Sequence, residues 1–395
     1  MSFKRGCLSV VAGVVVGAVG IWAVWFASMF YMLGHWSDPP PATPTPRTAF
    51  HFSYVRDRYT ATLLGDGRVL IAGGYVDPAR GPVASAELYD PQSGRFTPTG
   101  SMTHGHDLAT ATLLLDGRVL IVGGVYGSAT AELYDPETGT FSPTGSMTTG
   151  RDQASATRLT DGRVLIAGGQ QGTTQFLASA EIYDPISGTF SPTVSMAVAR
   201  WPQTATLLAD GRVLITGSEV NSTESATAEV YDPATGTFSR TGSTHAHGCD
   251  PTATLLPDGR VLMAGGANPG EQGGDRWAIG LNDAIQMYDP VTGTFSLAGS
   301  MISTAGCHQS TTLLSNGRLL IVSDKASAEL YDVATGRATQ TGSMRAARSA
   351  ATVTLLQDGR VLVTGGGIAQ AEVYDPATGT FSTTGSMGSP LDVTP

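Results

Sequence analysis

Lysine is nearly absent from this chain, and charge of either sign is sparse. Lys4 and Lys325 are the lysines, charged residues make up 14% of the sequence, and the formal net charge is −10. A surface that binds nucleic acid needs a stripe of basic side chains. The composition therefore argues against a nucleic-acid partner, and the acidic balance favours solubility.

Familiar catalytic motifs and helical periodicity are also missing. The sequence has no nucleophile elbow, no phosphate-binding glycine loop followed by lysine, and no His-Glu-x-x-His helix. These motifs mark common hydrolases, nucleotide-binding enzymes and metalloproteases. The leading hypothesis is therefore a binding or interaction module rather than an enzyme.

What the sequence does contain is one pattern that occurs seven times. The stretch Asp66-Gly-Arg-Val-Leu-Ile-Ala-Gly-Gly74 is followed by similar stretches at intervals of 42 to 58 residues. These begin at Asp116, Asp161, Asp210, Asp258, Asn316 and Asp358. Self-similarity at such a period indicates a solenoid, a propeller or an array.

Each repeat is predicted to form four antiparallel strands. Thr60 to Leu64 alternates small polar and apolar residues, Asp-Gly forms a hairpin turn, and the apolar return strand suits burial on both faces. Ala86 to Pro91 and the following Phe-containing segment give two further strands, joined by a turn with proline early and glycine late. Four-stranded units around an axis are the blades of a β-propeller. The sequence therefore predicts an all-β, seven-bladed propeller.

The repeats resemble the kelch family. The resemblance rests on the Gly-Gly that ends strand two, the aromatic residue of strand four, and the tyrosine of strand three: Tyr89, Tyr134, Tyr183, Tyr231, Tyr288, Tyr331 and Tyr374. The usual strand-four tryptophan is phenylalanine here, and the sixth repeat departs furthest, with Ser323-Asp324 in place of Gly-Gly. The resemblance implies a kelch-type propeller over residues 51–388.

The segment before the repeats is predicted to be a membrane anchor. Residues 7–34 form an uncharged apolar run long enough to cross a bilayer, after a short cytoplasmic N-terminus at 1–6 that carries Lys4 and Arg5. The positive-inside rule places the repeats outside the cytoplasm, in the periplasm or the extracellular space. The alternative is a signal peptide cleaved near Ala18 or Gly20. Residues 35–50 form a Pro-rich linker, and 389–395 a C-terminal tail.

Uncommon residues gather in the links that vary between repeats. Alternating strand direction puts the Asp-Gly-Arg and Asp-Pro turns on one face and the variable links on the other, where function usually lies. The binding-face candidates are Trp201, His245, His247, Trp277, His308, His104 and His106. The site is predicted to centre on repeats four to six, around Trp201, His245, His247, Trp277 and His308, because tryptophan is enriched in binding hot spots. The alternative is that repetitive positions exclude these residue types.

Nine residues before the Asp-Gly-Arg motif, repeats one to three carry aspartate and repeats five and six carry cysteine. Asp57, Asp107 and Asp152 could together bind a hard cation such as calcium, or cap turns and pair with a nearby arginine. Cys249 and Cys307 could form a disulfide in an oxidising compartment, remain free thiols, or bind a soft or borderline metal with the neighbouring histidines. No cofactor is predicted, so copper and calcium are alternatives only.

Residues present in every repeat are predicted to be structural. The turn arginines, such as Arg118, and the strand-three glutamates, such as Glu132, are expected to make charge-assisted contacts between repeats.

The leading function is a membrane-anchored, single-pass, extracytoplasmic propeller, monomeric, that binds a protein or carbohydrate through its variable links. The alternative, implied by the kelch resemblance, is a galactose oxidase-like copper-dependent oxidase or carbohydrate-acting enzyme. That family takes one histidine from a domain after the propeller, whereas no histidine follows His308 here.

Overall fold

The computed structural model describes most of the repeat region. The described residues are 56–76, 81–125, 127–201, 203–217, 226–244, 251–265, 267–269, 279–281, 283–302 and 309–388. They are all strands, turns and links, so the all-β prediction is confirmed for this part of the chain. The predicted anchor at 7–34, the linker and the tail lie outside the described residues. No helix within the described ranges is long and apolar enough to cross a membrane.

Four consecutive strands form the sheet of each repeat, as the hairpin chemistry predicts. The first strands are β1 (Thr60–Leu63), β5 (Thr110–Leu113), β9 (Ser155–Arg158), β15 (Thr204–Leu207), β19 (Thr252–Leu255), β25 (Ser310–Leu313) and β29 (Ala351–Leu355). The second are β2 (Val69–Ala72), β6 (Val119–Val122), β10 (Val164–Ala167), β16 (Val213–Thr216), β20 (Val261–Ala264), β26 (Arg318–Val322) and β30 (Val361–Gly365).

The outer strands continue the same order. The third are β3 (Ala86–Asp90), β7 (Ala131–Asp135), β13 (Ala180–Asp184), β17 (Thr227–Asp232), β23 (Ala284–Asp289), β27 (Ala328–Asp332) and β31 (Gln370–Asp375). The fourth are β4 (Arg95–Pro98), β8 (Thr140–Pro143), β14 (Thr189–Pro192), β18 (Thr237–Ser243), β24 (Thr294–Ser300), β28 (Arg337–Gln340) and β32 (Thr380–Ser386). We number the repeats 1 to 7 in this order. Two small hairpins add β11 (Gln170–Gln171) with β12 (Gln175–Phe176), and β21 (Ala267–Pro269) with β22 (Ile279–Leu281).

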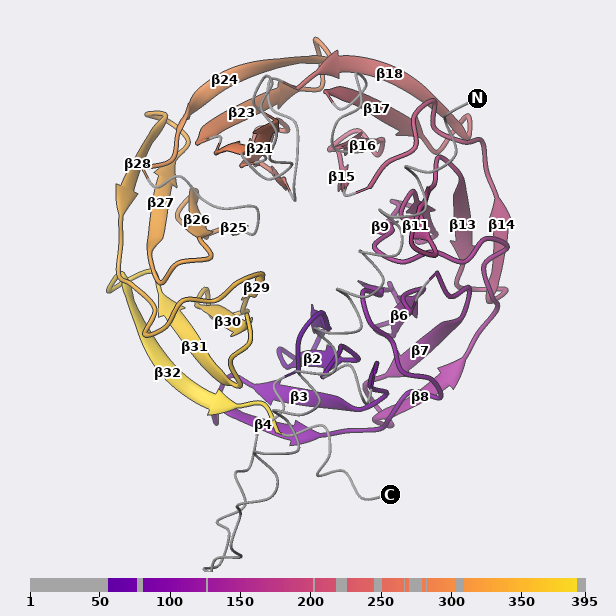
Figure 1. The fold of residues 1–395 in the computed structure, drawn as a ribbon, viewed down its shortest axis with the longest axis horizontal. Coiled ribbons are helices and arrows are strands. Elements are labelled where there is room, and N and C mark those ends of the chain that lie inside the picture. Colours follow the sequence, from indigo (N-terminus) through magenta and orange to yellow (C-terminus); the bar gives the residue numbers. More distant parts are fainter. Residues whose placement is uncertain are drawn as a thin grey trace, which may run out of the picture. The chain divides into compact units, whose positions relative to one another are not determined.

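The described sheets follow one another around a ring, with first strands innermost and fourth strands outermost (Figure 1). Each first strand lies beside that of the next repeat, and β29 lies beside β1. The second strands are buried over nearly their whole length, as their uninterrupted apolar sequence predicts. Apolar side chains of neighbouring repeats therefore share one core at each junction, as in the cluster that joins Val122 and Met147 to Val164.

The ring closes through the same contacts that join the other repeats. At an internal junction, the hydroxyls of Tyr134 and Thr99 lie 2.9 Å apart. At the closing junction, those of Tyr89 and Thr384 lie 3.0 Å apart, and the Gly385 N–H donates to the Gly94 carbonyl. No strand is exchanged between repeat 7 and repeat 1, because β29–β32 and β1–β4 each form a sheet in sequence order.

Candidate binding rim

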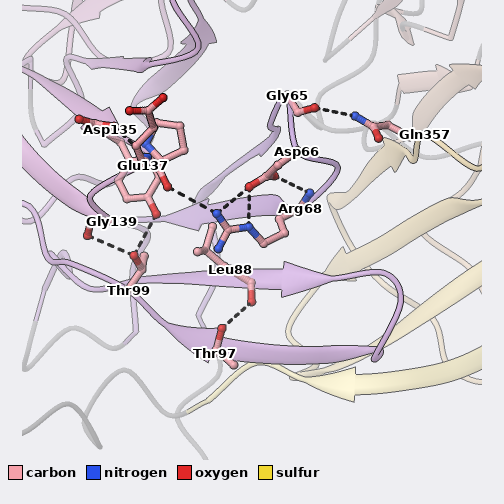
Figure 2. A network of polar contacts seen from close by, with 12 residues as sticks. Gly65, Asp66, Arg68, Leu88, Thr97, Thr99, Asp135, Glu137, Gly139 and Gln357 are labelled. Carbon is pink, nitrogen blue, oxygen red and sulfur yellow. Dashed lines mark hydrogen bonds and ion pairs between the residues drawn. The ribbon is translucent and has the colours of Figure 1, made fainter.

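The Asp-Gly-Arg and Asp-Pro turns lie on one face, as predicted. Most of their polar groups are hydrogen-bonded or ion-paired within the turns or to the turns of neighbouring repeats. In repeat 1, the Arg68 side chain forms an ion pair with Asp66 at 2.6 Å and reaches the Pro136 carbonyl of the next repeat, while Gln357 of repeat 7 donates to the Gly65 carbonyl (Figure 2). The opposite face contains the links before each first strand and those between strands two and three. We call this face the variable rim.

A buried basic side chain anchors the rim in several repeats. The residue ten positions before the Asp-Gly-Arg motif is Arg56, His106, Arg151, Arg200 or Arg348, and all five side chains are buried. Four of them contact the strand-three glutamate of their own repeat, at 2.9 to 3.3 Å. The glutamate also accepts backbone N–H groups from the preceding repeat, as Glu181 does from Thr148 and Thr149.

This arrangement corrects one sequence-based expectation. The turn arginines do not pair with the strand-three glutamates but with the aspartate two residues earlier, at the exposed turn. Four of the glutamates instead pair with these buried basic residues, of which His106 alone was among the predicted site residues. Aligning the repeats ten positions before the motif would have found them, because arginine stands there in four of the seven repeats.

The three aspartates of repeats 1 to 3 are positioned by one recurring backbone arrangement. Asp57 pairs with Tyr75, and Asp152 with Gln170, through reciprocal backbone hydrogen bonds of 2.7 to 3.0 Å. In repeat 2, the Val125 N–H donates to the Asp107 carbonyl at 2.9 Å. Each aspartate is thus joined to the residue that follows Gly-Gly in its own repeat.

The residue after each aspartate adopts the left-handed conformation that non-glycine residues rarely occupy. The φ angles are 55° for Arg58, 58° for Leu108 and 48° for Gln153, and Ala350 repeats the feature in repeat 7 at 55°. The Leu108 N–H donates to the Arg58 carbonyl, and the Gln153 N–H donates to the Leu108 carbonyl. A backbone ladder therefore joins repeats 1, 2 and 3 at the rim. Strain of this kind clusters at binding and active sites.

The aspartates differ in how their charge is compensated. The Arg58 backbone N–H donates to the Asp57 carboxylate, and the Arg58 guanidinium lies 3.6 Å from Asp107 and over the Tyr75 ring. Burial raises the pKa of Asp107, and Arg58 opposes the rise. Burial and the charge of Asp107 raise the pKa of Asp152 to about 6. One carboxylate oxygen each of Asp107 and Asp152 is buried without a hydrogen-bond partner.

Asp152→Asn is expected to stabilise the protein at neutral pH and not at acidic pH. An acid with a raised pKa in the folded state favours folding when protonated, so the wild type loses stability as pH rises from about 4 to about 6. Asn resembles the protonated form at every pH. We expect a gain of roughly 1–2 kcal/mol at pH 8 and little change at pH 4, measured by urea unfolding. A pH-independent difference between the two proteins would contradict this.

An aromatic pair stands beside Asp152. Trp201, which precedes the first strand of repeat 4, stacks on Phe176 of repeat 3 with ring centroids 5.2 Å apart and planes 9° from parallel. Phe176 lies in β12, opposite Gln170 of β11. Trp201, Phe176 and Gln170 are half-buried, so parts of their surfaces reach solvent.

The other predicted rim residues fall into two groups. His104 is exposed and contacts Thr103, whereas His106 is 2% exposed and lies against the Gly123 carbonyl and Glu132, an inward position that suits packing. His245, His247, Cys249, Trp277, Cys307 and His308 lie outside the described residues. The structure therefore joins the segments of Asp57, Asp107 and Asp152 through the backbone ladder and stacks Trp201 on Phe176 of repeat 3. The prediction of a site on repeats four to six stays a prediction.

The described residues do not form a metal centre. Among them, no group of three or more histidine, cysteine, aspartate or glutamate side chains could hold a metal ion. A copper radical site also needs tyrosines beside histidines. Tyr59, however, is packed against repeat 7 near Gly365, and His106 is already engaged by Glu132. The described residues thus do not fit copper.

Comparisons with known proteins agree with this architecture. Residues 155–197 match the model of the kelch motif, which confirms the kelch resemblance. The fold is similar to that of a solved fungal alcohol oxidase of the AA5 family, described as having catalytic diversity and as being in complex with copper. The TM-score is 0.63 at 19% sequence identity, over 79% of this chain and 70% of that one. At this identity the similarity concerns the fold. No curated protein matches the chain in sequence.

Proposed function

Because the chain carries a kelch motif on a propeller fold, we propose that it is a seven-bladed propeller that binds a protein or carbohydrate through its variable rim. One observation carries the proposal. The turn face repeats the same self-satisfied contacts, whereas the rim of repeats 1 to 4 combines unsatisfied carboxylate oxygens with a partly accessible aromatic pair. Partly exposed aromatic residues are the commonest anchors of binding surfaces.

Trp201→Ala is expected to reduce binding at least tenfold and to leave folding cooperative. The indole supplies a large, rigid surface on the rim, and its loss removes the stack with Phe176. The full-length protein would be applied in solution to a glycan array. The same protein, immobilised on beads, would be used for affinity capture from the envelope fraction. Ile186→Ala is the matched control, because Ile186 is 97% exposed in an Asp-Pro turn on the other face. If both variants lose binding equally, or if both retain it, Trp201 is not part of the binding site.

We also propose that residues 7–34 anchor the protein in the cell membrane with the propeller outside the cytoplasm. The support is the uncharged apolar run and the basic residues before it. The mature N-terminus, determined by mass spectrometry of membrane fractions, is expected to lie upstream of residue 7. A mature protein that begins near Ile21 would contradict the anchor.

A copper-dependent oxidase is the second candidate, and it rests on similarity to the fold of a copper-bound alcohol oxidase. Any copper ligands would have to include histidines and cysteines outside the described residues. Titration of the full-length protein with copper, followed by the absorption of a protein radical, would distinguish this candidate from a binding module.

A further inference from the structure

Four side chains form a row on the rim of repeats 3 and 4. Asp152 pairs directly with Gln170, and Gln170 pairs directly with Phe176, in successive antiparallel bridges. Side chains of directly paired residues project from the same face, about 5 Å from one another. Asp152, Gln170 and Phe176 therefore lie in line over about 10 Å, and Trp201 stacks at the end of the line on Phe176. This length suits a small organic molecule.

The acidic end of the row carries uncompensated charge. Asp152 is 7% exposed, one of its oxygens has no hydrogen-bond partner, and the neighbouring charge that acts on it is that of Asp107. The adjacent Arg151 is committed elsewhere, since its guanidinium donates to Glu181 and to the Gly168 and Ser179 carbonyls. Burying a carboxylate without a partner is costly. A ligand that brings a positive charge would relieve this cost.

The other end of the row offers an apolar, electron-rich surface. Phe176 and Trp201 are stacked nearly in parallel and are both half-buried. Such rings attract an organic cation and also cover the apolar part of a ligand. A hard metal ion would use six to eight oxygens and gain nothing from the rings. The combination of buried carboxylates and stacked rings thus fits an organic cation better than a metal ion.

We propose that this row binds a small organic cation, a primary ammonium group on a flat or apolar body. The ammonium would lie against the carboxylate of Asp152, with that of Asp107, which the Arg58 guanidinium already contacts, as the second neighbouring charge. The body would rest on Phe176 and Trp201. The inference rests on the proposed binding function of the rim and names its ligand class. Gln170, between the two ends, would hydrogen-bond the polar part of the ligand.

Calorimetry with the full-length protein tests this with two probes of nearly equal shape. Phenethylamine is expected to bind at least tenfold more tightly than phenethyl alcohol at pH 7.5. Asp152→Asn is expected to abolish that preference, and Asp135→Asn, in a turn on the opposite face, to leave it unchanged. Binding of the amine should weaken as pH falls below about 6, because protonation removes the charge of Asp152.

Three outcomes would overturn the ligand class. These are equal affinity for the two probes, no binding of the amine, or calcium binding that depends on Asp152 while the amine does not bind. Loss of capture in Trp201→Ala without any amine binding would refute this inference and leave the proposed function standing. Amine binding that depends on Asp152, with partner capture unaffected by Trp201→Ala, would refute the proposed function and keep the cation site.

Discussion

Arg151→Ala is expected to lower the free energy of unfolding by about 3–5 kcal/mol. The Arg151 side chain is fully buried, and its guanidinium donates to Glu181, to the Gly168 and Ser179 carbonyls and to the Ser179 hydroxyl. Its loss leaves the Glu181 carboxylate buried with a missing partner at the junction of repeats 2 and 3. Urea unfolding followed by circular dichroism would measure the change.

Arg163→Ala is the matched control. Arg163 also forms an ion pair, with Asp161 at 2.7 Å, but its side chain is 41% exposed in the turn. Exposed ion pairs contribute about 0–1 kcal/mol. A similar loss of stability in the two variants would show that the buried contacts of Arg151 stabilise the fold no more than an exposed turn ion pair does.

Gly123→Ala is expected to cost more than about 3 kcal/mol of stability. Gly123 directly follows β6 and has a φ of +73°, and a Cβ there would lie 2.2 Å from the Arg151 carbonyl oxygen of the next repeat. The left-handed conformation alone costs alanine about 1–2 kcal/mol. The clash with backbone adds to this, because neither repeat can move without opening the shared core.

Gly117→Ala separates these two costs. Gly117 lies in the Asp-Gly-Arg turn of the same repeat with a φ of +86°, and a Cβ there meets nothing within 4 Å. Gly117→Ala should lower the free energy of unfolding only by the cost of the left-handed conformation, about 1–2 kcal/mol. Equal melting temperatures for the two variants would show that the close approach of the repeats at Gly123 is unimportant.

Most of the fold could be predicted because every repeat contains nearly the same local sequence pattern. The Asp-Gly turn, the buried second strand and the strand-three tyrosine recur, so an error in one repeat is corrected by the others. Local pattern also placed the two kinds of turn on one face. The expected role of the turn arginines was wrong, because Arg118 is already paired with Asp116 in the same turn while Glu132 contacts His106 on the rim.

The candidate site was harder to predict because it depends on departures from the repeat. Alignment of the repeats predicts that Asp57, Asp107 and Asp152 occupy equivalent positions. It does not predict that Asp152 is buried or that the residues after the aspartates are left-handed. The stack of Phe176 on Trp201 needs the hairpin of β11 and β12 in repeat 3. This hairpin lies in the variable link between strands two and three, outside the repeated sequence pattern. Such contacts join different repeats, so only the assembled structure reveals them.

The closing junction has a consequence for how the protein is made. The core between repeat 7 and repeat 1 joins Val69, Ile71 and Tyr89 to Leu362 and Met387. A chain emerging from the ribosome therefore keeps one side of its first repeat exposed until repeat 7 has been synthesised. Contacts between such distant segments form slowly and leave apolar surface open to aggregation. A truncated polypeptide that ends before Met387 would form an open ring, and the exposed apolar side of its first repeat would be a target for chaperones and proteases.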